Sequence, residues 1–440
     1  MKSDYLLLGV IGKPVLHSRS PQMHNAALSK LNIPGHYLRI AAKDAKEAFE
    51  IAKIINLRGI NVTAPFKEEA FELSNHGDAL STKLRAANTL LFENETRAFN
   101  TDVEGVLRAF MSNGVSCEHK KALVLGAGAA ARAALCALRS QGATATVVNR
   151  TFEKAKRLAN EFGAKALCLN DPGLKNCVYD SELIVACLST PEKVIADGLL
   201  KASQCILDSM YKEKTALVEQ AQRAGAKVIN GLEWLIYQGA LAFEHFTSTK
   251  APIDEMRKAL ESAKSWESKK SIALIGMMGA GKSSIGRIIS EKLCFDFVDL
   301  DEELEKRQGM KIREIIDRKG EASFRNLEAS LFSEYVESEN VVFSCGGGLI
   351  LRLENRNLLK KHFLTIWIHA SEEELASRVA QDINRPLLSG YDTKSRLKEL
   401  FLERRPFYAE VADLFMSSQH SSERECAERI MYEIRAAGLS

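Results

Sequence analysis

Two glycine-rich segments carry the residue types that proteins use to hold phosphate groups. The first reads GAGAAAR over residues 126–132 and directly follows the apolar stretch KALVL. In a GxGxxA pattern between a strand and a helix, the first glycine permits a tight turn and the second lets the backbone approach a pyrophosphate at the helix N-terminus. The alternative is a plain strand-to-helix turn. We predict a dinucleotide site whose contacts are Gly126, Ala127, Gly128, Ala129 and Ala130.

The end of the next apolar stretch, ATVVNR, indicates which dinucleotide would bind. NAD sites usually place an acidic residue there, about 20 residues after the glycines, to bind the ribose 2′-hydroxyl. This chain has Asn149, Arg150 and Thr151 instead. Because a guanidinium suits a 2′-phosphate, Arg150 favours NADP, unless it is only a solvated basic residue.

The second segment, GMMGAGKS over residues 276–283, fits the pattern GxxxxGK[ST] without a mismatch. In this motif backbone N–H groups surround the phosphates, Lys282 reaches the β- and γ-phosphates, and the Ser283 hydroxyl is a Mg²⁺ ligand. The pattern therefore predicts a nucleoside triphosphate site. Its expected contacts are Gly279, Ala280, Gly281, Lys282, Ser283 and Ser284.

Hydroxyl and amide side chains gather near predicted strand ends upstream of residue 105. They occur in the segments HSRSP, NVTAPFK, ANT and NTD. Such groups can bind a polyhydroxylated ligand, and Lys67 with Asp102 can hold and move the proton that leaves when a hydroxyl is oxidised. The spacing leaves open whether these groups converge, and each of them alone is also typical of turns and caps.

Acidic and basic residues suited to a phosphoryl acceptor follow the second glycine-rich segment. Asp299 and Asp301 stand two positions apart at a predicted strand end, where they can serve a metal and a substrate or cap the next helix. The glycine run 346–348 lets bare backbone approach a ligand. Arg325 and Arg404 offer guanidinium groups to an anion, although scattered arginines are usually solvated.

Short apolar runs alternate with helical patterns along the whole chain of 440 residues. This alternation predicts an α/β fold with parallel, doubly wound sheets. Because a single core rarely exceeds about 250–300 residues, we expect more than one domain. The polar stretch 259–270 precedes a new apolar run, so we place a linker at 263–270 and a P-loop α/β domain with a parallel sheet over 271–440.

Bulk composition excludes several classes of protein. The net charge of +3 is too balanced to favour nucleic acid or an anionic membrane as a partner. The nine cysteines are scattered without a CxxC pair, which argues against a disulfide framework or a zinc site and favours the reducing cytoplasm. We find no signal peptide and no apolar run long enough to span a membrane.

Residues 5 to about 262 resemble shikimate dehydrogenase, with the family's motifs in the family's order. The segments that carry the resemblance include NVTAPFK, NTD and NRT. The resemblance implies a substrate-binding α/β domain over 1–105, to which helices of 236–262 return, and a Rossmann NADP-binding domain over 106–235. It also implies reduction of 3-dehydroshikimate to shikimate by NADPH.

The same resemblance implies roles for single residues. Ser18 and Ser20 would bind the substrate carboxylate, and Lys67 would transfer the proton. The remaining substrate contacts would be Thr63, Asn88, Asp102, Tyr211 and Gln238, with Asp102 also pairing with Lys67.

Residues 271 to about 435 resemble shikimate kinase, through the segments DLD, GEASFR, GGG, RPLL and RRPFY. The resemblance implies MgATP-dependent phosphorylation of the shikimate 3-hydroxyl. Asp299 would lie near Mg²⁺, Asp301 on the substrate hydroxyls, and Arg325 and Arg404 on the substrate carboxylate. The other implied contacts are Gly346, Gly347 and Gly348 at the substrate, Arg378 at the adenine and Arg385 over the phosphates.

Both resemblances imply the same small molecule, because one enzyme would make shikimate and the other would phosphorylate it. We also expect the two halves to fold separately and shikimate to pass between them through solution. One alternative is a quinate-type dehydrogenase fused to another small-acid kinase. A second is a sensor or scaffold in which one half binds ligand without turnover; intact Lys67, Asp102, Lys282 and Asp301 speak against it.

Overall fold

The computed structural model describes residues 5–188, 190–211, 213–262, 269–380 and 392–438. The chain forms two compact units. The first unit comprises Met1–Pro21, Leu31–Phe66 and Ser262–Ser440. The second comprises Gln22–Lys30 and Lys67–Glu261. Each unit is built on parallel strands, as the alternating apolar runs predict.

The first unit contains a parallel sheet in the strand order β14-β15-β13-β16-β17-β2-β1-β3. The strands are β1 (Leu6–Gly12), β2 (Gly35–Ala41), β3 (Gly59–Val62), β13 (Ser271–Ile275), β14 (Asp296–Asp299), β15 (Val341–Ser344), β16 (Phe363–His369) and β17 (Leu414–Ser417). All seven residues of β16 are buried, as expected for a parallel strand that is covered on both faces.

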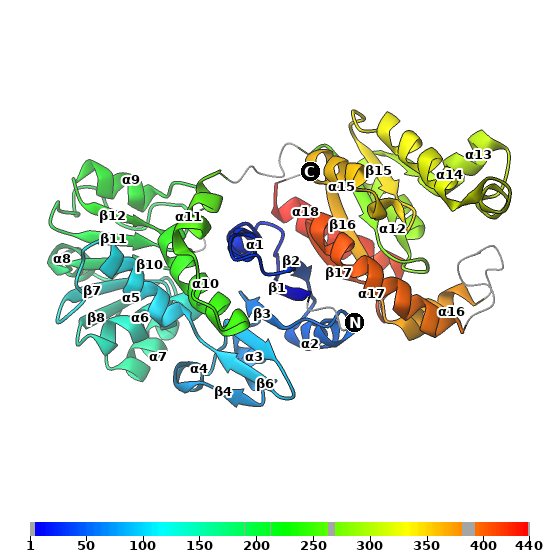
Figure 1. Ribbon diagram of the computed structural model, residues 1–440. Helices are drawn as coiled ribbons and strands as arrows, with labels where there is room; N and C mark the ends of the chain where they lie inside the picture. The colour runs from blue at the N-terminus through cyan, green and yellow to red at the C-terminus, as the bar shows by residue number, and fades with distance from the viewer. Residues whose placement is uncertain (1–4, 189, 212, 263–268, 381–391, 439–440) are drawn as a thin grey trace. The chain divides into compact units, whose positions relative to one another are not determined.

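Helices cover this sheet (Figure 1). They are α2 (Ala45–Ile54), α12 (Lys282–Leu293), α13 (Leu300–Gln308), α14 (Ile312–Glu334), α15 (Leu353–His362), α16 (Glu372–Val379), α17 (Thr393–Val411) and α18 (Glu423–Ala436), with the 3₁₀ helix η2 (Leu349–Leu351). Helix α12 packs on β14 and β15, whereas α17 and α18 both pack on β2.

The pairing of β2 with β17 joins the N-terminal segment to the P-loop segment in one sheet. Phe415 lies opposite Ile40 and Met416 opposite Ala41. Strands at the edge of a sheet present unpaired N–H and C=O groups, and this pairing covers the carboxyl-terminal part of that edge on β2. The contact is a direct connection between the two parts of the chain that we expected to fold separately.

The second unit contains a six-stranded parallel sheet in the order β12-β11-β10-β7-β8-β9. Its strands are β7 (Lys121–Leu125), β8 (Thr144–Asn149), β9 (Lys165–Cys168), β10 (Leu183–Ala186), β11 (Cys205–Asp208) and β12 (Lys227–Asn230). The order reverses beside β7, as in a doubly wound dinucleotide fold, where ligands bind beyond the carboxyl ends of the strands at this switch point. Three further strands are β4 (His76–Gly77), β5 (Thr89–Phe92) and β6 (Thr96–Phe99).

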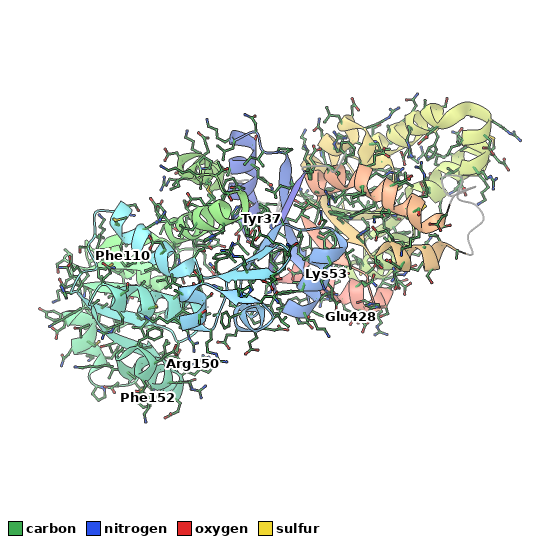
Figure 2. All side chains as sticks on the ribbon, turned by 60° about the horizontal axis from the view of Figure 1, so that its bottom comes forward. Tyr37, Lys53, Phe110, Arg150, Phe152 and Glu428 are labelled. Carbon is green, nitrogen blue, oxygen red and sulfur yellow. The ribbon has the colours of Figure 1, made fainter. Side chains whose placement is uncertain are left out.

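The helices of the second unit position the side chains of interest. They are α1 (Ser20–Lys30), which begins in the first unit, α3 (Lys67–Glu72), α4 (Ala79–Leu84), α5 (Asp102–Ser112), α6 (Ala129–Ser140), α7 (Phe152–Phe162), α8 (Leu174–Asp180), α9 (Ala216–Arg223), α10 (Gly231–Thr247) and α11 (Ile253–Ser262). Helix α5 packs against both α6 and α10. Phe110 of α5, labelled in Figure 2, belongs to the apolar core between these elements.

Candidate functional site

Lys67 and Asp102 form an ion pair in the second unit. Each residue is the first of its helix, α3 and α5, and the Lys67 Nζ lies 2.6 Å from Asp102 Oδ2. Their side chains are only 14% and 10% exposed. Removing two charges from water is costly unless they pair closely, and the short contact supplies that compensation. The structure therefore brings together the two residues that the sequence suggested for proton transfer.

The amide side chains of Asn88 and Gln238 lie near the start of α5, where Thr101 precedes Asp102. Asn88 Nδ2 donates to Thr101 Oγ1 at 2.9 Å and to Gln238 Oε1 at 3.2 Å, and Asn88 Oδ1 accepts from the Thr101 backbone N–H at 2.8 Å. The indole of Trp234 donates to the carbonyl of Asp102 at 3.1 Å. Two separate hydrogen bonds, from Asn88 to Gln238 and from Trp234 to the Asp102 carbonyl, thus link the start of α5 to α10.

Tyr211, the remaining residue of the second unit that the dehydrogenase resemblance singled out, lies just after β11 and is half-buried.

Gly105 explains how α10 comes so near α5. A Cβ atom at Gly105 would stand 2.9 Å from Cβ of Gln238 and 3.0 Å from the indole of Trp234. A larger residue there would push Gln238 away from Asn88.

Three residues predicted to bind the dehydrogenase substrate lie in the first unit. Ser18 and Ser20 are both buried, and the Ser20 N–H donates to Ser18 Oγ at 3.3 Å. Arg39 on β2 donates from Nε to the Ser18 carbonyl at 2.8 Å. Thr63 follows β3, where its N–H donates to the Ile11 carbonyl at 2.9 Å. Arg39 carries no motif, and the sequence analysis missed it.

Tyr37 is another residue of this unit that the sequence analysis missed. It donates from its hydroxyl to Asn61 Oδ1 at 2.7 Å and is hydrogen-bonded to Ser20. Burial raises the pKa of Tyr37, so it remains a neutral donor. Tyr37 is the third residue of β2 (Gly35–Ala41) and belongs to no motif, so nothing in the sequence singled it out.

The first glycine-rich turn has the backbone that its motif requires. Gly126 has a φ of 110°, and a Cβ there would collide with the carbonyl oxygen of Cys187. Gly128 is the N-cap of α6, and a Cβ there would meet nothing within 4 Å. Ala131 is fully buried where a small third residue is needed. The open backbone at Gly128 and at Ala129 in the first turn of the helix is suited to an approaching pyrophosphate.

Asn149, Arg150 and Thr151 connect β8 to α7. Asn149 Nδ2 donates to the Thr151 carbonyl at 3.0 Å, and Thr151 is the N-cap of α7. The side chain of Arg150 is exposed, and Figure 2 shows it at the surface near Phe152. No ion pair involving Arg150 is found among the residues that the structure describes. An exposed guanidinium beside a helix N-terminus is suited to an anion.

The second glycine-rich segment forms a loop between β13 and α12. Gly279 and Gly281 have positive φ values of 78° and 90°, which their lack of a Cβ permits. Lys282 donates from Nζ to the Met277 carbonyl at 3.1 Å. A cavity of about 340 Å³ opens beside the loop. Its lining includes Gly279, Ala280, Gly281, Lys282, Ser283, Ser284, Asp299, Asp301 and Arg378.

Ser283 and Asp299 form the pair that could hold a divalent cation. The Ser283 hydroxyl donates to Asp299 Oδ2 at 2.6 Å. The other oxygen, Oδ1, caps α13 by accepting from the N–H groups of Asp301 and Glu302 at 3.1 and 3.3 Å. Asp299 is therefore a helix cap and a cavity residue at once. A hydroxyl and a carboxylate are ligands that Mg²⁺ accepts, with water completing its shell.

Two arginines flank the glycine run 346–348. The Arg404 guanidinium donates to the Gly347 carbonyl at 3.1 Å, and a Cβ at Gly348 would collide with the guanidinium of Arg325. Asp301 Oδ1 would stand 2.8 Å from a Cβ at Gly346. Three charged groups that are far apart in the sequence thus converge on one glycine segment.

Two residues that sequence analysis missed hold these arginines and glycines. Glu328, 4% exposed, accepts from Arg325 Nη1 at 2.8 Å. Burial raises the pKa of Glu328, and the charge of Arg325 opposes that shift. Tyr408 donates to the Gly347 carbonyl at 2.6 Å. Glu328 stands three residues after Arg325, a helical spacing that could have suggested the pair.

Arg378 lies at the rim of the loop cavity. It donates to the Ser418 carbonyl at 2.8 Å, to the Ser418 hydroxyl at 3.1 Å and to the Gly279 carbonyl at 3.3 Å. Arg385 lies outside the described residues.

Among the helices that the structure describes, none is long and apolar enough to cross a membrane.

Four family models match successive parts of the chain. They are the shikimate dehydrogenase substrate binding domain at residues 10–90, shikimate / quinate 5-dehydrogenase at 109–211, the shikimate 5′-dehydrogenase C-terminal domain at 231–261, and shikimate kinase at 278–435.

Curated relatives match the first part of the chain almost over their full lengths. The chain is 38% identical over 275 residues to the shikimate dehydrogenase (NADP(+)) of Dehalococcoides mccartyi, covering 58% of this chain and 96% of that protein. It is 39% identical over 264 residues to the shikimate dehydrogenase (NADP(+)) of Halobacterium salinarum, covering 58% of this chain and 98% of the relative.

Solved structures agree over the same region. Shikimate dehydrogenase from Aquifex aeolicus superposes with a TM-score of 0.56 and 34% identity, covering 60% of this chain and all of that one. The enzyme from Thermus thermophilus in complex with NADP(H) and shikimate gives a TM-score of 0.54 and 32% identity, covering 58% of this chain and 98% of the other.

Proposed function

This chain belongs to the shikimate dehydrogenase family and carries a shikimate kinase domain after it, and we propose that it catalyses two consecutive steps on one metabolite. The first is the NADPH-dependent reduction of 3-dehydroshikimate to shikimate. The second is the ATP-dependent phosphorylation of shikimate to shikimate 3-phosphate. The observation that carries this proposal is the presence in one chain of a buried Lys67–Asp102 pair and a P-loop beside Ser283 and Asp299.

In the reductase, bound NADPH supplies a hydride for the substrate carbonyl carbon. The carbonyl oxygen then needs a proton, and the Lys67 ammonium is the group that donates it. Asp102 holds Lys67 Nζ at 2.6 Å and so fixes the direction of that proton. Asn88 and Gln238 are hydrogen-bonded to each other and are suited to the substrate hydroxyl groups.

The other substrate contacts follow from side-chain chemistry. Ser18 and Ser20 offer hydroxyl groups to the substrate carboxylate, and Thr63 and Tyr211 offer hydroxyl groups to the ring substituents. Arg150 would bind the 2′-phosphate of NADP at the surface beside α7, which distinguishes NADPH from NADH.

In the kinase, positioning and electrostatics do most of the work of phosphoryl transfer. Lys282 and the loop N–H groups would bind the phosphates, and Ser283 and Asp299 would hold Mg²⁺, which supplies positive charge to them. Asp301 faces the glycine segment and is suited to the hydroxyl that attacks. Arg325 and Arg404 would hold the substrate carboxylate between them, with Arg378 on the nucleotide side.

We further propose that the enzyme acts on small molecules in the reducing cytoplasm. In support, all nine cysteines are free thiols, and the net charge of the chain is +3. Neither a nucleic acid nor a membrane is needed for either reaction.

Two assays on the full chain test the function. NADPH oxidation is followed with 3-dehydroshikimate, and ADP release is followed with shikimate. Quinate and NAD(P)+ form the comparison reaction, because a quinate-type enzyme would oxidise quinate faster than shikimate. Lack of either activity would reject the corresponding half of the proposal.

Passage of shikimate through solution between the two sites stays a prediction. It is tested by adding unlabelled shikimate to a coupled reaction of labelled 3-dehydroshikimate. Free exchange dilutes the label in shikimate 3-phosphate, whereas retention of the full label would contradict it.

A further inference from the structure

A buried carboxylate in the last helix of the kinase region (residues 271–440) accepts hydrogen bonds from the backbone of the dehydrogenase region (residues 5–262). Glu433 lies near the end of α18 and is 3% exposed. Its Oε2 accepts hydrogen bonds from the N–H groups of Val15 at 2.7 Å and Leu16 at 2.9 Å. Both amides lie between β1 and α1, in the first unit that also contains α18.

The two amides begin the turn that leads to the serine segment. The Ser18 N–H donates to the Val15 carbonyl at 2.9 Å, so Val15 closes the turn on one side and is held by Glu433 on the other. Ser20 follows two residues later and hydrogen-bonds to Ser18 Oγ. A shift of Val15 would therefore move both serines.

The kinase region also contacts Arg39, a residue of β2 that binds the same turn. Arg39 is buried and donates to the Ser18 carbonyl at 2.8 Å and to the Asp413 carbonyl at 3.3 Å. Asp413 directly precedes β17, the strand that pairs with β2. The Ser18 carbonyl is thus bound by an arginine that is itself hydrogen-bonded to the kinase region.

The same face of α18 is fastened to the dehydrogenase region one turn earlier. Arg429 donates to both carboxylate oxygens of Glu47 at 2.9 and 2.6 Å, and to the Ala41 carbonyl at 2.9 Å. A bidentate pair of this kind fixes orientation as well as distance. Helix α18 therefore has a defined register against β2, and this register sets where Glu433 lies.

Glu433 has no evident use in phosphoryl transfer. It does not line the cavity beside the P-loop, which α18 reaches instead through Glu423 and Cys426 at its other end. Burial raises the pKa of Glu433, and the two amide hydrogen bonds act in the opposite direction. A carboxyl group so costly to bury needs its hydrogen bonds, and both of those that the structure gives it go to the turn before Ser18.

We propose that Glu433 is a positioning residue for the reductase: through the amides of Val15 and Leu16, the kinase region fixes the segment that binds the substrate carboxylate. This inference rests on the proposed reductase function and on the roles of Ser18 and Ser20 in it. It adds that a residue more than 400 positions away in the chain governs substrate binding at the first active site.

The test compares variants of the full chain in both assays. Glu433→Ala removes the acceptor of two backbone amides, so the KM for 3-dehydroshikimate should rise about 10-fold or more, while kcat changes by less than about 3-fold. The KM for NADPH and the kinase constants for shikimate and ATP should not change. Glu433→Gln keeps an oxygen acceptor and should recover part of the affinity. Glu428→Gln, on the exposed side of α18, is the matched control and should behave as the parent chain.

Glu433→Asp provides a second test in case Glu433→Ala does not fold. It keeps the charge but withdraws the carboxylate by one methylene, so it should also raise the KM for 3-dehydroshikimate, and it decides the matter if the alanine variant is unfolded. A parent-like KM in a folded Glu433→Ala or Glu433→Asp variant would overturn the proposal. So would an equal loss of kcat and of kinase activity, which indicates general destabilisation. A parent chain without reductase activity would reject the proposed function itself.

Discussion

Lys67 Nζ and Asp102 Oδ2 lie 2.6 Å apart although 35 positions separate the two residues in the chain. Helices α3 and α5 each begin at one of these residues, so the fold fixes both ends of the contact. Neither residue lines the cavity beside the P-loop, so a change in the pair should affect the reductase and not the kinase.

Lys67→Ala should abolish NADPH oxidation with 3-dehydroshikimate and leave shikimate phosphorylation intact. Loss of a positioned proton donor typically costs about 10²- to 10⁴-fold in rate. Steady-state kinetics of both reactions measure the effect. Lys53→Ala, at the exposed lysine labelled in Figure 2, is the control and should leave both reactions unchanged. Near-normal NADPH oxidation in Lys67→Ala would remove this residue from the mechanism.

Arg150→Ala should weaken NADPH binding by roughly 10- to 100-fold, because one charge-assisted hydrogen-bonding group is lost. NADH lacks the 2′-phosphate, so its binding should hardly change. Arg157→Ala, an exposed arginine further along α7, provides the comparison. Cofactor titrations by fluorescence measure both dissociation constants. Equal losses for the two cofactors would show that Arg150 is structural.

Arg325→Lys should raise the KM of the kinase for shikimate although the charge is kept. A point ammonium cannot reproduce the two-pronged hold of a guanidinium on a carboxylate, nor its simultaneous contact with Glu328. We expect a rise of about 10-fold, with the KM for ATP unchanged. Arg318→Lys, at an exposed position of the same helix, should have no effect. Unchanged shikimate kinetics would reject this assignment.

Acid should destabilise the first unit through His369. This residue is buried, stacks on Phe401 at 4.3 Å between ring centroids, and has its pKa lowered by burial to about 3. The folded protein keeps this histidine neutral, so its full stability is present above the pKa of about 6.5 in the unfolded chain. As the pH falls from 6.5 towards 3, the free energy of unfolding decreases by up to about 1.4 kcal/mol per pH unit. Measured from pH 7 to 4, the urea midpoint of the parent should fall more steeply with decreasing pH than that of His369→Leu. Parallel curves would contradict this expectation.

The segment 1–262 expressed alone should have a higher KM for 3-dehydroshikimate than the full chain. Without the kinase region, β2 has an unpaired edge and the amides of Val15 and Leu16 lose their acceptor. Kinetics and sedimentation velocity measure the two effects, of which the second is self-association through the edge. A monomeric segment with the KM of the full chain would show that the halves are independent, as the sequence alone suggested.

That contrast shows where sequence reasoning succeeds and where it stops. Local patterns predicted the parallel strands and the turns at Gly126 and Gly281, because backbone conformation there depends on neighbouring residues. The acidic residue Asp299 was ambiguous between cap and ligand: its Oδ1 caps α13 and its Oδ2 accepts a hydrogen bond from Ser283, while its role as a metal ligand stays a prediction.

The pairing of β2 with β17 and the target of Glu433 could not be predicted in this way. Neither has a local signal, since an edge strand looks the same in sequence whether solvent or another strand lies beside it. Glu328 shows an intermediate case, because its spacing from Arg325 is regular but such spacing is common on any helix.

The β2–β17 pairing also has a consequence for synthesis of the chain. Asp413, next to β17, leaves the ribosome 374 positions after Arg39 of β2. At translation rates of about 5–20 residues per second, the edge of β2 waits for roughly 20 to 75 s before its partner exists. A nascent chain thus exposes an unpaired strand edge for most of its time on the ribosome. The yield of folded protein should therefore depend on chaperones that cover this edge until translation ends.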